Sequence, residues 1–312
     1  MPVQLRSLAE DRFPVWREQT RSRLISLRQE SGSLPGEDAV AQTDTVLEQL
    51  LPEGHATPTS SVLTIRDGST DLGTVWLAST DGILFVIDLS FGTAPDRRQQ
   101  DELFEALLSA ARDHEDSRLS VSLYAPDLAG RAFLEGRGFT CASIQMLLDP
   151  LPTRATTRRT EVEPMTAERY PSFAAASEAA FADDLVASAR YSVEDARVES
   201  RRQMALELPE GLDSPGQELF TASVDGAEVG ILWLGVRSRE GRPHVFILDI
   251  EVVPEHRGRG YGRDIMLAAE REARRLGADS IGLHVFGFNA GAIHLYESLG
   301  YRRVEERFLR SI

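Results

Sequence analysis

A glycine-rich stretch at residues 257–262 has the residue types of an anion-binding turn. An apolar strand pattern precedes it at residues 245–250, and a helical pattern follows it and ends near Gly277. Main-chain N–H groups without helical partners gather at such a helix N-terminus, where the helix dipole also favours a negative charge. Glycine lets the main chain approach a phosphate closely because it carries no Cβ. The stretch therefore predicts a phosphate-binding turn, and the alternative is a flexible glycine turn that carries two surface arginines.

The spacing Gly-x-Gly-x-Gly excludes two common nucleotide-binding motifs. The dinucleotide fingerprint has the spacing Gly-x-Gly-x-x-Gly, and the nucleotide P-loop requires a lysine next to a serine or threonine. The chain contains no lysine. A second pattern lies downstream, where a strand at residues 280–285 leads to Asn289, an expected N-cap, and then to a helix that closes at Gly300. The two patterns together are more specific than the glycine stretch alone.

Both patterns resemble the conserved blocks of the GNAT superfamily of acyl-CoA-dependent N-acyltransferases. The first block is Arg257-x-x-Gly260-x-Gly262, and the second runs from residue 283 to residue 301. The blocks occur in the family's order and at about its separation, and the resemblance is clear from about residue 159 to the end. It implies a mixed α/β fold whose central strands splay apart, with acetyl-CoA as the co-substrate of an acetyltransferase.

The resemblance also implies which residues would hold acetyl-CoA. Main-chain groups at the end of the fourth strand would pair with the pantetheine arm, and the glycine turn would cradle the pyrophosphate. For Asn289, which would hydrogen-bond the pantetheine arm, the alternative is a helix N-cap without ligand contact, and both roles are compatible. The expected cofactor-binding residues are Val252, Val253, Arg257, Gly258, Arg259, Gly260, Tyr261, Gly262, Asn289 and Ala292.

Acyl transfer from a thioester to an amine also requires proton transfers. Tyr296 matches the family's usual tyrosine, so the resemblance implies a general acid, and the alternative is a core tyrosine on an amphipathic helix. Asp249 and Glu251 lie two residues apart on one strand, so alternation places both carboxylates on one face as candidate bases. The position aligned with the family's carboxylate base is Phe246, which alternation places on the opposite face unless a bulge intervenes. An ordered water is the other candidate base.

The chain repeats one unit twice. Three short segments recur at a single offset of 157 residues, which indicates a tandem duplication. The paired segments start at Arg12 and Arg169, at Leu51 and Leu208, and at Leu72 and Val229. The predicted domains are a degenerate GNAT-like domain at 1–150, a linker at 151–159 and a catalytic GNAT domain at 160–312. Each domain is expected to be an α/β unit with a mixed, splayed β-sheet flanked by helices.

The first repeat lacks the features that would carry chemistry in the second. Its residues 98–103 stand opposite the glycine turn, and none of them is glycine. Further along, Leu134 stands opposite Tyr296 and Asp127 stands opposite Asn289. We therefore interpret the first repeat as a degenerate copy, kept for stability, for dimer formation or to shape the acceptor pocket of the second.

Composition narrows the choice of partners and compartment. The 34 basic and 49 acidic residues give a net charge of −15, which disfavours nucleic acid or an anionic membrane as a partner. The single cysteine offers neither an internal disulfide nor a metal cluster, and no His, Cys or Asp spacing suggests a metal. No apolar run is long enough to span a bilayer. We expect a cytoplasmic protein without a metal, and homodimer formation stays open.

The sequence as a whole predicts an acetyl-CoA-dependent N-acetyltransferase with one working site in the second repeat. The acceptor is expected to be a primary amine of a small molecule, attacked directly in a ternary complex because the second repeat has no cysteine for a covalent relay. Asp183 and Asp184 either face this cationic amine or are solvated. The alternatives are a peptide or protein N-acetyltransferase, and a non-catalytic CoA-binding regulator or scaffold. Tyr296 argues against the regulator because binding alone needs no acid.

Overall fold

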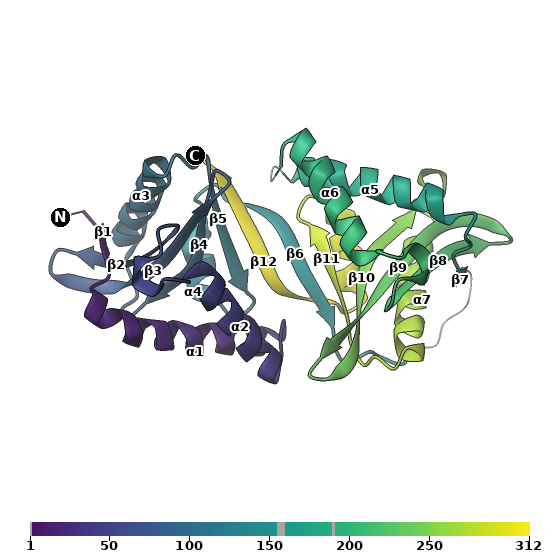
Figure 1. Ribbon diagram of the computed structural model, residues 1–312, viewed down its shortest axis with the longest axis horizontal. Helices are drawn as coiled ribbons and strands as arrows, with labels where there is room; N and C mark the ends of the chain where they lie inside the picture. Colours follow the sequence, from purple (N-terminus) through teal and green to yellow (C-terminus); the bar gives the residue numbers. More distant parts are fainter. Residues whose placement is uncertain (1, 155–159, 189–190) are drawn as a thin grey trace. The chain divides into compact units, whose positions relative to one another are not determined.

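The computed structural model describes residues 2–154, 160–188 and 191–312 of the chain. They form two compact units (Figure 1). The first unit contains the residues up to Ala142 together with Val304–Ile312, and the second unit is Ser143–Arg303. Both units are mixed α/β structures, as predicted from the sequence. None of the helices in the described ranges is long and apolar enough to cross a membrane.

A mixed sheet flanked by helices forms the first unit. Its described strands run in the order β1-β2-β3-β4-β5-β12, and β4 and β5 are parallel whereas the other neighbours are antiparallel. The strands are β1 (Gln4–Ser7), β2 (Ser60–Asp67), β3 (Thr70–Thr80), β4 (Ile83–Phe91), β5 (Arg118–Tyr124) and β12 (Arg302–Ser311). The helices are α1 (Phe13–Ser31), α2 (Gly36–Leu50), α3 (Arg97–Asp113) and α4 (Leu128–Leu134).

The second unit repeats this plan. Its described strands run in the order β7-β8-β9-β10-β11-β6, and β10 and β11 are the parallel pair. The strands are β6 (Thr140–Leu148), β7 (Glu161–Pro164), β8 (Gln217–Val224), β9 (Ala227–Arg239), β10 (Arg242–Val252) and β11 (Ile281–Phe286). The helices are α5 (Tyr170–Ala187), α6 (Val193–Glu207), α7 (Tyr261–Arg275) and α8 (Ala290–Ser298).

The last strand of each sheet comes from the other sequence repeat. β6 follows α4 along the chain, but its residues 143–148 pair antiparallel with β11 of the second unit. β12 follows α8, but its residues 305–311 pair antiparallel with β5 of the first unit. The compact units therefore differ from the repeats at 1–150 and 160–312, and those domain boundaries remain a prediction for the repeats.

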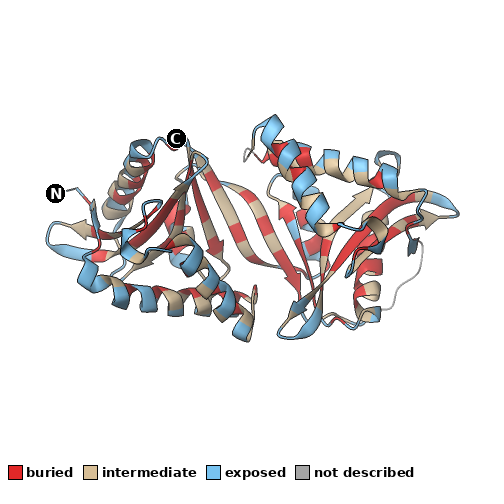
Figure 2. Ribbon diagram, viewed as in Figure 1, coloured by how far each residue is buried: buried red, intermediate tan, exposed pale blue. Residues whose placement is uncertain are grey.

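Equivalent core contacts in the two units agree with a duplication. Buried residues follow the strands of both units (Figure 2). Trp16 of α1 meets Trp76 of β3 edge-on at 5.6 Å, and Phe173 of α5 meets Trp233 of β9 edge-on at 6.0 Å. Each residue of the second pair lies 157 residues after its counterpart in the first pair. In both units the strand tryptophan donates its indole N–H to a side chain 16 residues earlier. The N-terminal helix of each repeat is thus held on its sheet by the same aromatic contact.

The strand exchange predicts which fragment of the chain folds better. A fragment of residues 143–303 keeps β6 on β11, whereas a fragment of residues 160–312 leaves β11 as an open edge and carries an unpaired β12. The first fragment should unfold at least about 5 °C above the second, because β6 buries several apolar side chains. Circular dichroism melts of both purified fragments measure this. Equal melting temperatures, or a more stable 160–312, would contradict the role given to β6.

Candidate active site

A bulge in β10 sets the direction of the candidate catalytic side chains. The pairing of β10 with β9 shifts between Ile247 and Asp249, so one extra residue, Leu248, is inserted there. Side-chain alternation restarts after the bulge, and Phe246 lies on the same face as Asp249 and Glu251. Simple alternation predicts Phe246 on the opposite face, and the bulge, which the sequence left open, brings it to the same face instead.

Contacts with α5 identify this shared face. Ser177 of α5 donates its hydroxyl to Oδ2 of Asp249 at 2.6 Å. The ring of Phe246 meets His284 of β11 edge-on at 5.8 Å. Two residues further along β11, and so on the same face, Phe286 contacts an aromatic ring of α5 at 6.5 Å. The Asp249 carboxylate, which accepts from α5, and the ring of Phe246 therefore lie on the same side of the sheet.

Sequence reasoning missed Ser177. Helix α5 is rich in alanine and has little amphipathic contrast, so no polar stripe marks the serine. The repeat carries the usable signal, since Thr20 stands 157 residues earlier and also bears a hydroxyl. A hydroxyl at one position of both repeats indicates an inward-facing hydrogen-bond donor.

β10 and β11 part next to the bulge. Their parallel pairing runs only from Val245 opposite Ile281 to Ile247 opposite Leu283, although β11 continues to Phe286. Beyond the bulge, the described chain supplies no strand partner for the β10 main-chain groups on this edge. An extended ligand can hydrogen-bond with such groups as a strand would. This parting is the splayed geometry that the sequence resemblance predicts.

Asp249 holds its negative charge in an unfavourable place. Burial has the largest effect and raises its pKa, the Ser177 hydrogen bond lowers it, and the charges of Glu251 and Asp184 raise it further. Asp184 lies in the last turn of α5, where burial and the neighbouring Asp183 raise its pKa as well. Among the described residues, no cation forms an ion pair with Asp249 or Asp184. This face of the second unit therefore carries unbalanced negative charge.

The charge of Asp249 acts on Tyr296 of α8. The Tyr296 side chain is buried, and burial together with the charge of Asp249 raises the pKa of the phenol to about 12. The hydroxyl therefore keeps its proton through the neutral range and can donate it. The rings of Tyr296 and Tyr301 pack at 6.0 Å, which holds the phenol in place. The fold thus brings the predicted acid together with one of the two predicted bases.

Glu251 and Arg257 pair with each other. The Glu251 side chain is 45 % exposed, and its Oε1 lies 3.3 Å from Nη2 of Arg257. Nε of Arg257 also donates to the main-chain oxygen of Val252 at 3.0 Å. Arg257, which the sequence predicts in the phosphate cradle, is therefore turned back to the end of β10. The predicted catalytic and phosphate-binding roles of this pair remain predictions.

The glycine turn connects β10 to α7 in a form that fits a phosphate group. Gly258 and Gly260 have left-handed φ values of 74° and 90°, and a Cβ at either position would meet no atom within 4 Å. Within the described part of the chain, the main-chain N–H groups of residues 258–262 have no hydrogen-bond acceptor. Arg259 is exposed and forms no ion pair with a described residue. The turn therefore combines open space, free donors and a cation.

The other predicted cofactor-binding residues have contacts within the protein. The main-chain N–H of Val253 donates to β9 at 3.0 Å. The ring of Tyr261 meets that of His256 at 6.0 Å. Oδ1 of Asn289 accepts the main-chain N–H of Ala292 at 3.2 Å, so Asn289 is the N-cap of α8. A contact of these residues with pantetheine remains a prediction.

In the first unit, protein groups occupy the equivalent positions. Helix α3 starts with a capping box. The main-chain N–H of Gln99 donates to Oδ1 of Asp96 at 2.8 Å, and the main-chain N–H of Asp96 donates to Oε1 of Gln99 at 2.9 Å. These bonds satisfy N–H groups that would otherwise be available to a phosphate. Asp127 caps α4 as Asn289 caps α8, and buried Leu134 stands in place of the phenol. In the first unit, the groups that the sequence shows as missing are thus replaced by side chains that make contacts within the protein.

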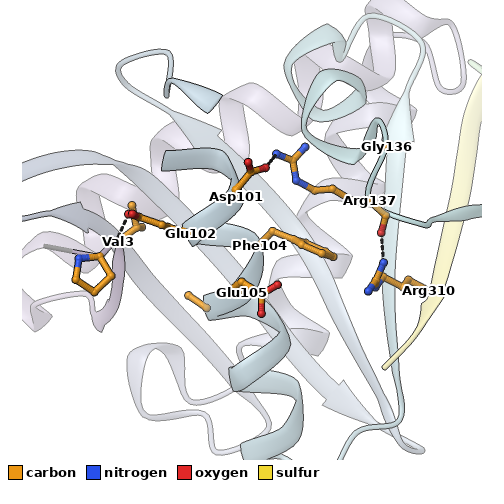
Figure 3. Close-up of a pocket in the computed structure, with 10 residues that line it drawn as sticks. Val3, Asp101, Glu102, Phe104, Glu105, Gly136, Arg137 and Arg310 are labelled. Atoms are coloured by element: carbon orange, nitrogen blue, oxygen red, sulfur yellow. Dashed lines mark hydrogen bonds and ion pairs between the residues drawn. The ribbon is translucent and has the colours of Figure 1, made fainter. Parts of the chain in front are cut away.

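A cavity of about 600 Å³ in the first unit contains none of the predicted site residues (Figure 3). Phe104 of α3 lines it, and the guanidinium carbons of Arg137 and Arg310 lie 5.9 Å and 4.9 Å from the centre of its ring. Arg137 also pairs with Asp101 at 2.5 Å. These arginines are engaged in packing and ion pairing, so we assign no reaction to the cavity.

Comparison with known proteins identifies the family of this part of the chain. Residues 174–301 match the family model described as Acetyltransferase (GNAT) family. The chain carries a GNAT acetyltransferase domain. The GNAT domain is 29 % identical over 143 residues to the uncharacterized N-acetyltransferase YycN of Bacillus subtilis, which spans 46 % of this chain and 92 % of that relative. The chain is also 37 % identical over 92 residues to the streptothricin acetyltransferase of Streptomyces lavendulae, spanning 30 % of this chain and 48 % of the relative.

A solved structure extends the likeness to both units. The GCN5-related N-acetyltransferase from Sphaerobacter thermophilus matches 99 % of this chain and 95 % of its own, with a TM-score of 0.53 and 16 % identity, which shows the fold alone. The family match spans the bulge, the glycine turn and Tyr296. The acyltransferase class predicted from the sequence is confirmed, and enzymes of the GNAT family generally take acetyl-CoA as their donor.

Replacement of the Asp249 carboxyl should stabilise the folded protein at neutral pH. The pKa of Asp249 is raised in the folded state. The free energy of unfolding therefore falls as the pH rises from the ordinary aspartate pKa of about 3.9 through the raised value. Asp249→Asn should therefore melt above wild type by roughly 2–4 °C at about pH 7.5, and the difference should vanish near pH 3.5. Thermal unfolding across this pH range measures it. Asp183→Asn is the control with the same charge change at an exposed position, and no gain in Asp249→Asn would refute the assignment.

Proposed function

We propose that this protein transfers an acetyl group from acetyl-CoA to a primary amine of a small molecule, at one site in the second unit. The observation that carries the proposal is that the charge of the Asp249 carboxylate acts on the buried phenol of Tyr296 and raises its pKa, beside the point where β10 and β11 part. A protein that only binds CoA needs neither a buried acid nor a buried carboxylate at this point. The streptothricin acetyltransferase relative acts, by its name, on a small molecule, which supports a small-molecule acceptor.

The donor would bind along the open edge of β10. Main-chain groups of β10 beyond the bulge would pair with the pantetheine arm, and the N–H groups of residues 258–262 with Arg259 would hold the pyrophosphate. Acetyl-CoA supplies the activated acyl group, and the residues of the chain bind and orient it. Holding the thioester beside the amine is itself worth several kcal/mol of the barrier.

The chemistry requires nitrogen to lose two protons and sulfur to gain one. The Asp249 carboxylate accepts one proton from the ammonium group of the acceptor, and the freed amine nitrogen attacks the thioester carbonyl carbon. A C–N bond forms, the C–S bond breaks, and the Tyr296 hydroxyl gives its proton to the departing sulfur. The second nitrogen proton restores the phenol, and Asp249 returns its proton to water. Acid and base are then ready for the next turnover.

Removal of the Tyr296 hydroxyl should separate catalysis from binding. Tyr296→Phe should lower kcat roughly 10²–10⁴-fold, the usual contribution of one positioned proton donor, while the Kd for acetyl-CoA stays within about 3-fold of wild type. CoA thiol release across a panel of amines, aminoglycosides and peptides measures turnover, and calorimetry measures binding. Tyr170→Phe, which removes a hydroxyl from α5, is the control and should retain full turnover.

Each outcome of that assay is informative. Turnover that is unchanged in Tyr296→Phe would remove the acid role. Tight acetyl-CoA binding without thiol release from any acceptor would remove the proposed activity and favour the CoA-binding regulator. Release with peptides alone would replace the small-molecule acceptor by a peptide or protein amine.

Arg259 should contribute to donor affinity through its free charge. Arg259→Gln should raise the Kd for acetyl-CoA about 5- to 20-fold, because a charge-assisted hydrogen bond to phosphate is lost, and the effect should shrink at high salt. Titration calorimetry at low and high ionic strength measures both effects. Arg197→Gln, an exposed change of the same kind on α6, should leave the Kd unchanged. An Arg259 variant with wild-type affinity would take this residue out of the cradle.

A further inference from the structure

Both units hold a carboxylate at the same place beside a β-bulge. In the first unit the register of β3 and β4 shifts between Trp76 and Leu77, and Asp88 is paired with Trp76. In the second unit Asp249 is paired with Trp233 at the shift in β10. The two tryptophans are separated by the repeat offset of 157 residues. Asp88 and Asp249 are therefore structural equivalents.

The helices that face these carboxylates are also equivalent, and one of the positions at which they differ lies beside the carboxylate. Thr20 of α1 and Ser177 of α5 are separated by the repeat offset. Three residues further on, and so on the same helical face, stand Arg23 in α1 and Ala180 in α5. Nη2 of Arg23 forms an ion pair with Oδ1 of Asp88. The second unit has only a methyl group where the first has this guanidinium arm.

Arg23 and Asp88 both line a small cavity in the first unit. The Asp88 side chain is 1 % exposed, and a carboxylate at such a depth is unstable without a cation. Beside the pair, the cavity lined by β4, β5 and α4 has a volume of about 20 Å³, room for about one water molecule. Its walls include Val86, Leu123 and Phe133, so the arginine reaches the carboxylate on a three-methylene arm among apolar side chains.

We infer that Asp249 binds the cationic amino group of the acceptor at the position that the Arg23 guanidinium takes beside Asp88. In the first unit, the Arg23 guanidinium then takes the place that the ammonium group of the bound acceptor takes in the second unit. The inference rests on the proposed function and narrows its substrate class: the acceptor is an amine at the end of an unbranched alkyl arm, not an amine on a crowded carbon. An arm of this shape matches the methylene chain of Arg23.

The charges that face Asp249 agree with a cation arriving from outside the chain. Glu251 is balanced by Arg257, whereas Asp184 forms no ion pair with a described residue. Tyr296 is uncharged in the neutral range, and Ser177 offers only a hydroxyl. An entering ammonium group therefore meets negative side chains, with no ion-pairing cation at Asp249 in the described part of the chain to compete with it.

The test installs the arginine of the first unit in the second. Ala180→Arg should carry a guanidinium to Asp249 and exclude the acceptor, and Ala180→Met offers similar reach without charge. For n-butylamine, kcat/KM should fall at least about 10-fold further in Ala180→Arg than in Ala180→Met, while the acetyl-CoA Kd of both stays within about 3-fold of wild type. Equal losses in the two variants would overturn the inference and leave the proposed function standing on wild-type turnover.

A second measurement does not depend on turnover. At about pH 7.5 Ala180→Arg should melt above Ala180→Met, and this gain should vanish when both changes are combined with Asp249→Asn, because the cycle isolates the Arg–Asp pair. A missing gain, or one that persists with Asp249→Asn, would overturn the inference. If wild type releases no thiol with any amine, the proposed function fails, whereas this cycle still reports on the cation position.

The alkyl-arm claim has its own comparison. Wild type should turn over n-butylamine with a kcat/KM at least about 10-fold above that for tert-butylamine, because the crowded carbon beside the nitrogen of tert-butylamine has no counterpart in the methylene arm of Arg23. The two isomers carry the same charge and nearly the same apolar volume. Equal values would refute the unbranched arm, and a reversed preference would refute it as well.

Discussion

The bulge at Leu248 is the constraint on which the candidate site depends. One extra residue turns the Asp249 carboxylate to the face covered by α5, where Ser177 holds it. At the same point β10 stops pairing with β11, so its main-chain groups are left for a ligand. Both consequences follow from the geometry of a pleated strand, in which a single insertion reverses every side chain beyond it.

The two units share one backbone arrangement and differ in the side chains that contact its polar groups. Each has a bulge, a carboxylate beside it and a parallel strand pair that ends early. In the first unit the capping box of α3 and the Arg23–Asp88 ion pair supply partners from within the protein. In the second unit the corresponding donors and carboxylate are left without such partners in the described chain, which costs stability and is typical of functional sites. Duplication kept the backbone and changed the side chains that fill it.

Strand exchange gives the degenerate repeat a physical reason to persist. β11, which leads to the Asn289 cap and the Tyr296 helix, has β6 of the first repeat as its antiparallel partner. The side chains of Ile144 and Met146 on β6 are almost fully buried, so they belong to the core beneath the site. A second repeat without the first would expose the edge of β11. The copy without catalytic groups thus completes the sheet that carries them.

Much of the fold and part of the site follow from local patterns in the sequence. The glycine turn, the N-cap Asn289 and the helix that carries Tyr296 are set by neighbouring residues, since capping, left-handed glycine and helical spacing act within a few positions. The duplication was also readable, because equal offsets survive where the core packing is equal.

Other features were decided only by tertiary structure. Whether Asp249 and Glu251 share a face with Phe246 depends on the bulge, and neither alternation nor composition records an inserted residue. The strand exchange is also hidden from the sequence, since the local pattern of a strand does not record which of the two sheets it joins. The charge balance at Asp249 and Asp88 was hidden too, because it depends on which helix side chain faces each carboxylate across the fold. Sequence alone determined the chemical groups and their local supports, and long-range packing decided which of them meet.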